Sequence, residues 1–251
     1  MKIINALGIL ALAATLTSCW PASKRPTASH PAAATQLGTL APKTVQLGTP
    51  GEAAPRGYHL TFDDGPHPFH TPALLDWLKA NNIRATFFVL GSNVQRYPDL
   101  ARRIVQEGHQ IGNHSWSHAN FGKLSDTKAR SEIRRTHDLI VKTCGRAPTA
   151  FRPPYGILSQ RQRTWIQREF AYRVMLWDID TEDWKRSSTN AIAGRITQGL
   201  RSGRTNVILA HDIHPRILPA LKTLLPRLRA DGFKAVPALS QQGKAQEVAA
   251  R

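Results

Sequence analysis

The stretch Thr61-Phe-Asp-Asp-Gly-Pro66 places two adjacent carboxylates at the point where a strand pattern stops. Before it, Tyr58 and Leu60 alternate with polar residues, which is the two-residue period of a β-strand. The Gly-Pro pair ends the strand, because proline donates no backbone hydrogen bond and glycine relaxes the backbone. Neighbouring side chains of a strand point to opposite faces, so Asp63 and Asp64 share a site only because the strand ends there. Adjacent carboxylates favour a cation or a proton between them, although Asp-Gly-Pro also forms ordinary turns.

Strand and helix patterns alternate through the rest of the chain, in roughly seven units. This pattern is typical of a parallel sheet covered by helices, and such a sheet can curl into a barrel with its chemistry at the carboxyl ends of the strands. The expected strands cover residues 58–62, 84–90, the surroundings of Ile111, 150–152, 172–178, 206–210 and 233–236. The expected helices cover residues 71–80, a segment through Ile104 that ends at Gly108, the segment from the Ser125 cap to Gly145, and residues 159–170, 190–200 and 217–230.

Two histidines follow the third expected strand, in the motif His114-Ser-Trp-Ser-His118. Histidines four residues apart lie on one face of a helical turn. Together with a carboxylate they form a three-ligand metal site that leaves coordination positions open. A lone histidine pair is more often part of a surface or a core, but this pair comes directly after a strand, as the two aspartates do. We therefore expect a metal site here, and we interpret His67, His70 and His109 as incidental.

Three further strand ends contain ionisable residues. Arg152-Pro-Pro-Tyr155 follows the fourth strand, and the planar guanidinium of Arg152 suits one of the strand-end carboxylates, with a structural salt bridge as the alternative. The fifth strand leads into Asp178-Ile-Asp-Thr-Glu-Asp-Trp184, which has four acids and which alternatively forms a solvated loop. The sixth ends in Leu209-Ala-His211, whose histidine pKa a neighbouring acid would raise.

These five motifs, in this order, resemble those of polysaccharide deacetylases with a NodB-homology domain, which form carbohydrate esterase family four. The resemblance covers a domain of residues 58–240. It implies an α/β fold, a distorted and incomplete (β/α)7 barrel in a single domain. It also implies an enzyme that removes N-acetyl groups, or in some members O-acetyl groups, from sugar polymers with a divalent metal.

The family motifs imply a role for each matching residue. Asp64, His114 and His118 correspond to the metal ligands, and Asp63 corresponds to the general base, oriented by Arg152. The metal is expected to be zinc, with cobalt, nickel or manganese as alternatives.

The other matching residues correspond to an oxyanion donor, a general acid and contacts to the substrate. The Tyr155 N–H corresponds to a donor for the oxyanion, and Tyr155 also corresponds to a substrate-binding residue. His211 corresponds to the general acid. Family resemblance pairs it with an acid of the fourth motif, and we expect Asp180, with Asp183 as the alternative. Leu209 is expected to receive the acetyl methyl group, and Trp184 to form a wall against a sugar ring.

The expected substrate is an N-acetylglucosamine-containing polysaccharide of the cell envelope, either peptidoglycan or poly-N-acetylglucosamine. Alternatives within the family are an O-deacetylase for acetylated xylan and an inactive sugar-binding relative. A basic metal-dependent nuclease would need a second metal or a clustered phosphate groove, which the sequence does not clearly offer. A non-haem iron oxygenase shares the ligand set, but its usual succession of strands is absent.

The first 57 residues predict a targeting signal followed by a linker. Residues 1–19 resemble a lipoprotein signal, with a short basic start, an apolar run and the ending Leu16-Thr-Ser-Cys19. The resemblance implies lipidation of Cys19, hence a membrane anchor, with the outer membrane favoured because Trp20 follows the cysteine. Plain secretion or a periplasmic location is the alternative. Residues 20–57 are rich in Pro, Ala and Thr and predict a flexible linker, and residues 241–251 predict a polar tail.

Composition indicates a globular domain, with 41% hydrophobic and 20% charged residues. The net charge of +17 favours anionic polymers or a membrane surface, but the basic residues are scattered, which is also typical of a well-solvated surface. We expect no nucleic-acid partner and a monomer. Cys144 falls on the buried stripe of an expected helix and is interpreted as a small core residue.

Overall fold

The computed structural model describes residues 56–201 and 203–237, which form one α/β domain. The predicted signal with Cys19, almost all of the predicted linker and the predicted tail lie outside the described residues. The first strand begins at Arg56, so the predicted linker overlaps its first two residues. Within residues 56–201 and 203–237, no helix is both long enough and apolar enough to span a membrane.

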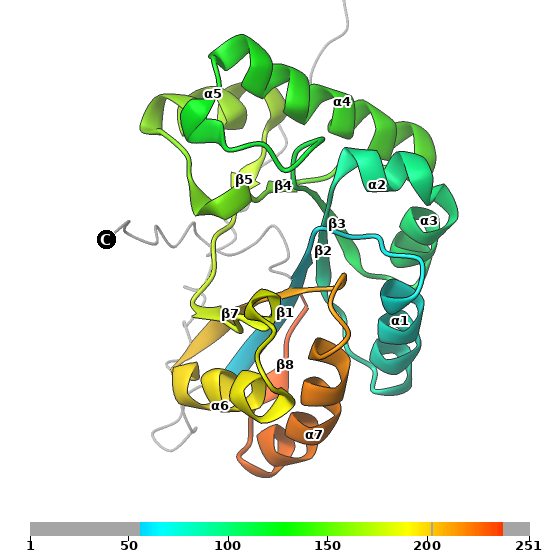
Figure 1. Cartoon of the computed structure of the whole chain (residues 1–251), viewed down its shortest axis with the longest axis vertical. Coiled ribbons are helices and arrows are strands. Elements are labelled where there is room, and N and C mark those ends of the chain that lie inside the picture. Colours follow the sequence, from blue (N-terminus) through cyan, green and yellow to red (C-terminus); the bar gives the residue numbers. More distant parts are fainter. Residues whose placement is uncertain (1–55, 202, 238–251) are drawn as a thin grey trace, which may run out of the picture. The chain divides into compact units, whose positions relative to one another are not determined.

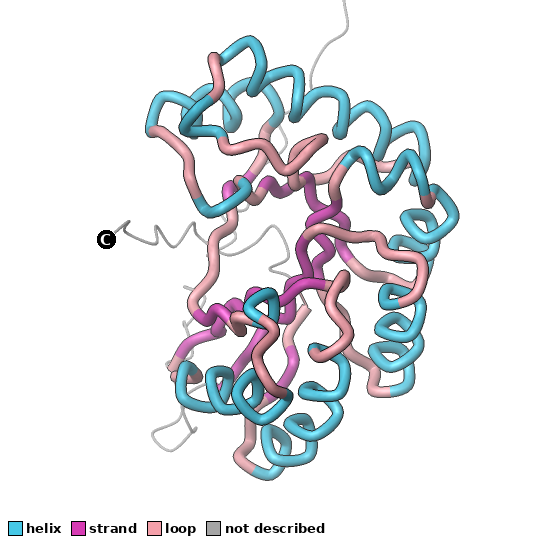
Figure 2. Tube along the Cα trace, viewed as in Figure 1, coloured by secondary structure: helices cyan, strands magenta, loops and turns pink. Residues whose placement is uncertain are grey.

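Eight parallel strands form one curled sheet, with helices on its outer side (Figures 1 and 2). The order is β5-β4-β3-β2-β1-β7-β6, and β8 pairs with β1 beside this path. The sheet is not closed, because its two edge strands, β5 and β6, do not pair. This confirms the expected incomplete, distorted barrel. The strands are β1 (Arg56–Asp63), β2 (Thr86–Val89), β3 (Gln110–Asn113), β4 (Ala150–Phe151), β5 (Arg173–Val174), β6 (Ile179–Asp180), β7 (Arg204–His211) and β8 (Lys234–Ala235).

Three of the helices begin at a serine whose side chain caps the first turn: Ser125 before α4, Ser159 before α5 and Ser188 before α6. Ser125 accepts a hydrogen bond from the Lys128 N–H at the start of α4, and Gly145 ends this helix in the left-handed conformation. Helix α2 was not predicted, because its six residues are too few to show a helical period. The helices are α1 (His70–Ala80), α2 (Gly91–Arg96), α3 (Pro98–Gln106), α4 (Asp126–Cys144), α5 (Gln160–Phe170), α6 (Thr189–Gly199) and α7 (Ile217–Ala230).

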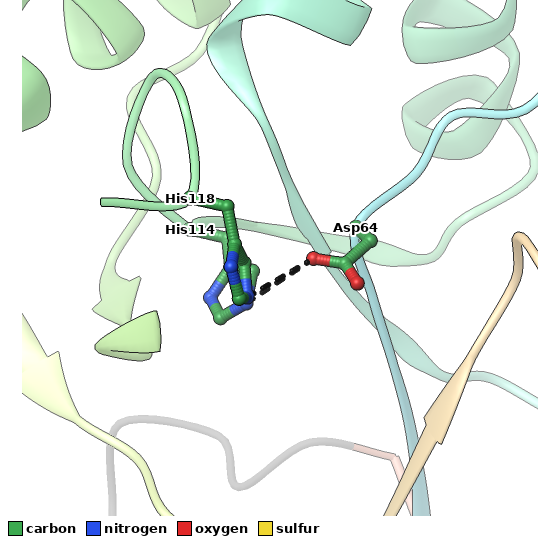
Figure 3. Close-up of side chains that lie close together, drawn as sticks. All are labelled: Asp64, His114 and His118. Atoms are coloured by element: carbon green, nitrogen blue, oxygen red, sulfur yellow. Dashed lines mark ion pairs between the residues drawn. The ribbon is translucent and has the colours of Figure 1, made fainter. Parts of the chain in front are cut away.

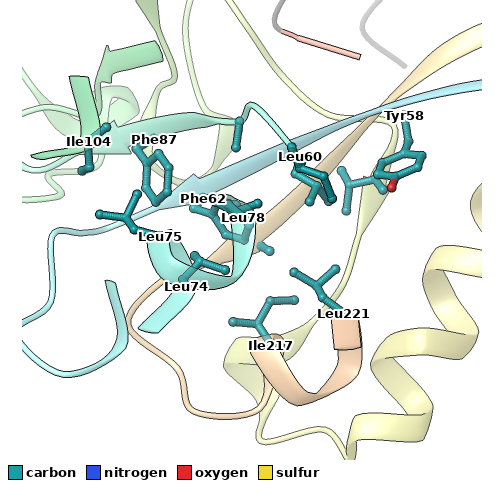
Figure 4. Close-up of a cluster of buried hydrophobic side chains, with 14 of the residues drawn as sticks. Tyr58, Leu60, Phe62, Leu74, Leu75, Leu78, Phe87, Ile104, Ile217 and Leu221 are labelled. Atoms are coloured by element: carbon teal, nitrogen blue, oxygen red, sulfur yellow. The ribbon is translucent and has the colours of Figure 1, made fainter. Parts of the chain in front are cut away.

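The two faces of β1 have different surroundings. Its apolar positions, Tyr58, Leu60 and Phe62, belong to the main hydrophobic core together with residues of α1 and α7 (Figure 4). Its polar positions alternate with these and therefore lie on the inner face of the curl, where His59, Thr61 and Asp63 are also buried. The strand period thus directs Asp63 into the barrel.

The predicted strand over residues 172–178 is confirmed only at β5, which is shorter than expected. The next strand, β6, begins at Ile179 on the opposite edge of the sheet, and residues 175–178 connect the two strands. We call residues 175–178 the crossover segment. An apolar run does not reveal where strand pairing stops, so the sequence pattern extended β5 through this connection. Cys144 ends α4 and is partly buried against the main core, in agreement with the prediction.

Candidate active site and metal centre

Three potential metal ligands converge at the carboxyl ends of β1 and β3. Oδ1 of Asp64 lies 3.6 Å from Nε2 of His114 and 3.5 Å from Nε2 of His118 (Figure 3). Together these residues form the one group of three or more candidate ligands among residues 56–201 and 203–237. Ligand atoms around a tetrahedral ion with bonds of about 2.1 Å lie about 3.4 Å apart, so this spacing fits a bound ion.

Three further observations agree with a metal at this place. Oδ1 of Asp64 is buried and has no hydrogen-bond partner among the described residues, which is costly unless a cation compensates it. Nδ1 of His114 lies 2.7 Å from the Arg152 carbonyl oxygen and donates to it, so Nε2 keeps its lone pair. Burial lowers the pKa of His118, which favours the neutral imidazole that a metal needs. The residues present therefore fit a divalent metal.

The predicted helical turn between His114 and His118 is wrong. Ser115 and His118 have φ values of 71° and 60°, so this segment is an irregular loop. The rings converge nevertheless, because the loop is held from both sides. The side chain of Asn113 accepts a hydrogen bond from the Ser115 N–H, and Oγ of Ser115 accepts one from the His118 N–H.

Glu132 of α4 also holds this loop, and sequence reasoning missed it. Oε2 of Glu132 accepts hydrogen bonds from the backbone N–H groups of Trp116 and Ser117, at 2.9 and 2.8 Å. Glu132 also accepts a hydrogen bond from the Ser117 hydroxyl. Glu132 is half-buried between the exposed and the buried positions of α4, and an acid there gives no sequence signal of this contact.

Asp63 lies beside the three candidate ligands and is held by a buried arginine. The Asp63 side chain is 3% exposed, and its Oδ1 accepts a hydrogen bond of 2.7 Å from Arg152. Its Oδ2 lies 3.6 Å from Nε2 of His114 and faces the candidate metal centre. Arg152 also donates to the Thr61 hydroxyl and to the carbonyl oxygens of Met175 and Leu176 in the crossover segment. One carboxylate oxygen is thus fixed while the other faces the reacting side.

His211 lies next to Asp63, because the two residues are register partners on β7 and β1. Asp183 accepts hydrogen bonds from Nδ1 and from the backbone N–H of His211, at 2.8 and 2.9 Å. Burial alone would lower the pKa of His211, but the hydrogen bond and charge of Asp183 outweigh it, and with the charges of Asp63 and Asp64 they raise this pKa to about 9. The imidazole is therefore protonated in neutral solution.

The prediction that Asp180 is the acid partner of His211 is wrong. Asp180 pairs in register with Leu209, two residues before His211, and its side chain accepts a hydrogen bond from the Glu182 N–H. Glu182 has a φ of 51°, and this turn brings Asp183 back to the level of His211. Asp183, three residues beyond the end of β6, is therefore the acid partner of His211.

The remaining predicted site residues differ in exposure. Tyr155 lies in the short 3-10 helix Pro154–Gly156 with a φ of 60°, and its ring packs edge-on against His118 at 4.6 Å between centroids. Leu209 is buried on the inner face of β7, as the register partner of Thr61. Trp184 is 49% exposed, in the short 3-10 helix Asp183–Lys185. Tyr155 and Trp184 therefore offer exposed aromatic surface next to the buried polar residues.

Known proteins resemble this chain in sequence and in fold. The model of the family described as "Polysaccharide deacetylase" matches residues 51–175. A peptidoglycan-N-acetylglucosamine deacetylase of Bacillus cereus is 37% identical over 191 residues, which are 74% of this chain and 68% of that protein. The peptidoglycan-N-acetylglucosamine deacetylase PgdA of Listeria monocytogenes is 38% identical over 177 residues, 70% of this chain. The chain spans only 37% of the length of PgdA.

A solved structure has the same fold. The family 4 carbohydrate esterase from Streptomyces lividans, in complex with acetate, superposes with a TM-score of 0.69 at 34% sequence identity. The similarity covers 76% of this chain and 97% of the esterase.

Proposed function

Because the chain belongs to the polysaccharide deacetylase family, we propose that it hydrolyses N-acetyl groups of an N-acetylglucosamine-containing polysaccharide of the cell envelope. The candidate substrates are peptidoglycan, which relatives of this chain deacetylate, and poly-N-acetylglucosamine. The observation that supports this proposal best is that a candidate general base, Asp63, lies beside a candidate general acid, His211. Asp63 and His211 are neighbours on β1 and β7, and Oδ2 of Asp63 lies 3.6 Å from Nε2 of the candidate ligand His114.

Asp64, His114 and His118 would hold the metal, and two imidazole nitrogens with one carboxylate oxygen suit zinc. When bound, such a metal polarises an acyl oxygen and activates water. Oδ2 of Asp63 accepts the proton of the attacking water, while Arg152 fixes the orientation of Oδ1.

The leaving group requires a proton, because an amide nitrogen leaves poorly as an anion. Protonated His211 donates it, and Asp183 keeps the ring oriented and charged. The Tyr155 N–H donates to the developing oxyanion, Leu209 contacts the acetyl methyl group, and Trp184 contacts a sugar ring.

The first test is Asp63→Asn, which removes the base and keeps the shape of the side chain. We expect acetate release from an N-acetylglucosamine polymer to fall by about 10²- to 10⁴-fold while the bound metal remains. His114→Ala should instead lose metal and activity together, measured by elemental analysis and acetate assay. Full activity of Asp63→Asn would show that another residue is the base.

The choice of polymer needs a direct comparison. We expect acetate release from peptidoglycan or poly-N-acetylglucosamine, abolished by a chelator and restored by zinc. Chitin oligomers and acetylated xylan are the comparison substrates. Release from xylan alone would favour the O-deacetylase, and release from none of the four would favour an inactive relative.

We also propose that Cys19 anchors the protein to the envelope through a lipid, and that the domain acts as a monomer. The support is the sequence Leu16-Thr-Ser-Cys19 after an apolar run. Cys19→Ala should release the protein from the membrane fraction, followed by immunoblot of fractionated cells. Membrane association that is unchanged in this variant would contradict the anchor.

A further inference from the structure

Phe69 is the most exposed large hydrophobic side chain among residues 56–201 and 203–237, with an exposed fraction of 78%. It lies in the segment that connects the end of β1 with the start of α1, shortly after the candidate ligand Asp64. We call residues 64–69 the Phe69 loop. Single exposed apolar residues are common on protein surfaces, so exposure alone indicates no function. What matters is how the loop is held and which groups lie beside it.

Hydrogen bonds hold the Phe69 loop in one conformation. The His67 N–H donates to the Thr71 hydroxyl at 2.7 Å, and the Thr71 N–H donates to the His67 carbonyl oxygen at 3.2 Å. Nδ1 of His67 accepts from the N–H groups of Phe69 and His70, both at 3.3 Å. The Thr71 hydroxyl in turn donates to the buried carboxyl group of Asp212, in the loop after β7. The fold therefore orders the Phe69 backbone before any ligand binds, which lowers the entropic cost of binding there.

A series of partly exposed rings connects Phe69 with the proposed general acid. The Phe69 ring lies 5.9 Å from the ring of His67, which stacks on His70 at 4.5 Å between centroids. His70 and His214 line the same cavity, of about 160 Å³, between α1 and α7. The ring of His214 lies 5.7 Å from that of His211. The series therefore starts at the reacting groups and ends at Phe69.

A sugar chain suits this surface. The face of a pyranose ring presents C–H groups, which pack against an aromatic ring, and its edge presents hydroxyl groups. Phe69 offers an aromatic face, and each histidine ring has a nitrogen that can donate or accept a hydrogen bond. Phe69 is the one large hydrophobic residue of its loop that is exposed. So small an apolar area does not suffice for a protein interface, whereas it matches the face of one sugar.

We propose that Phe69 is the platform of a sugar-binding subsite, in which its ring packs on a pyranose face of the polysaccharide, away from the residue that is deacetylated. This inference rests on the proposed deacetylase function and specifies how the protein holds its polymer. A long sugar chain occupies the reaction centre and the subsite together. A disaccharide that reacts beside His211 is too short to cover the rings between His211 and Phe69.

Phe69→Ala tests the subsite, and the exposure of the side chain makes a loss of folding unexpected. Acetate release is measured on the disaccharide and the hexasaccharide of chitin and of peptide-free peptidoglycan strands. For the hexasaccharides we expect KM to rise about tenfold with kcat unchanged, as the loss of a half-buried aromatic contact predicts. The values for the disaccharides should not change. Phe69→Trp keeps an aromatic face and should retain the wild-type KM.

Val141→Ala is the matched control, because it removes an exposed apolar side chain from α4, outside the active-site motifs. It should leave KM unchanged for both chain lengths. Equal KM changes on disaccharide and hexasaccharide in Phe69→Ala, or no change on either, would overturn the subsite. A loss in Phe69→Trp as large as that in Phe69→Ala would do the same.

A binding measurement separates this inference from the proposed function. In an Asp63→Asn background, calorimetry should show about tenfold weaker binding of a hexasaccharide when Phe69 is also replaced by Ala. Should the wild type release no acetate from any of these sugars, the deacetylase function fails, while this comparison still decides the subsite. Unchanged affinity, or no binding by the Asp63→Asn protein itself, would overturn it.

Discussion

At the residue scale, Asp183 controls the protonation of His211. Both of its carboxylate oxygens accept hydrogen bonds from His211, one from the ring and one from the backbone. This holds the ring in one orientation and raises its pKa to about 9 against the opposing effect of burial. A general acid must be protonated at the working pH, so activity is expected to fall as the pH rises through this value.

Asp183→Asn should move the alkaline limb of the pH–rate profile to lower pH. The amide removes the negative charge that holds the proton, so the His211 pKa returns towards its ordinary value of about 6.5. We expect kcat/KM at pH 8 to fall about tenfold or more, measured by acetate release between pH 6 and pH 10. Asp180→Asn is the matched control and should leave the limb in place. The opposite pattern would restore Asp180 as the partner.

Most residues of the site could be predicted, because strand periodicity and strand-ending residues place them without tertiary information. Asp63 and Asp64 are examples, since the Gly-Pro pair after them ends β1. The partner of His211 could not be predicted in this way. It depends on the left-handed turn at Glu182, which a non-glycine residue rarely adopts and which no local signal indicates.

At the element scale, helix α4 fixes the loop that bears the two histidine ligands. Glu132 accepts two backbone N–H groups of this loop, and the loop has no regular structure of its own. A metal site needs its ligands fixed before the ion binds, and contacts outside the ligand shell do this.

Glu132→Ala should weaken metal binding while the fold persists. Loss of such a supporting contact typically costs about 10- to 100-fold in metal affinity. Competition with a coloured zinc chelator measures the change, and circular dichroism checks the fold. Glu169→Ala is the control, because it removes an acid that pairs with Arg130 at the surface, away from the loop. An unchanged zinc affinity in Glu132→Ala would mean that the loop is rigid without this contact.

Helices with good caps and a clear apolar stripe could be predicted from the sequence, as α4 with its Ser125 and Gly145 ends illustrates. The pairing of the edge strands could not be predicted. β5 and β6 have two residues each, and which edge each one joins depends on the curl of the whole sheet.

At the scale of the whole domain, buried neutral histidines connect neighbouring strands. His59 of β1 donates from Nδ1 to the Val236 carbonyl and accepts at Nε2 from the Thr86 hydroxyl of β2. His109 accepts the Ala85 N–H. Burial lowers the pKa of both histidines to about 4. An added proton would remove an acceptor in the core.

We therefore expect a fall in pH to destabilise the domain before the pH is low enough to protonate its carboxylates. Between pH 6.5 and 4 the unfolded chain binds protons that folded His59 and His109 do not. This stability is complete above pH 6.5 and is lost as the pH falls, at up to about 1.4 kcal/mol per pH unit for each histidine. Urea unfolding of metal-free protein at several pH values measures the slope. His59→Gln should have a shallower slope than the wild type, and equal slopes would contradict the prediction.

The crossover segment divides the catalytic groups along the chain. The proposed base, its arginine and the three candidate ligands all precede Met175, and the family match also ends there. The His211–Asp183 pair comes entirely after it. A polypeptide cut within residues 175–178 would give one fragment that can accept a proton and another that can deliver one. The pairing of β1 with β7 and β8, and the core shared by α1 and α7, would reunite them, so turnover by two mixed fragments would report directly on the re-formation of these contacts.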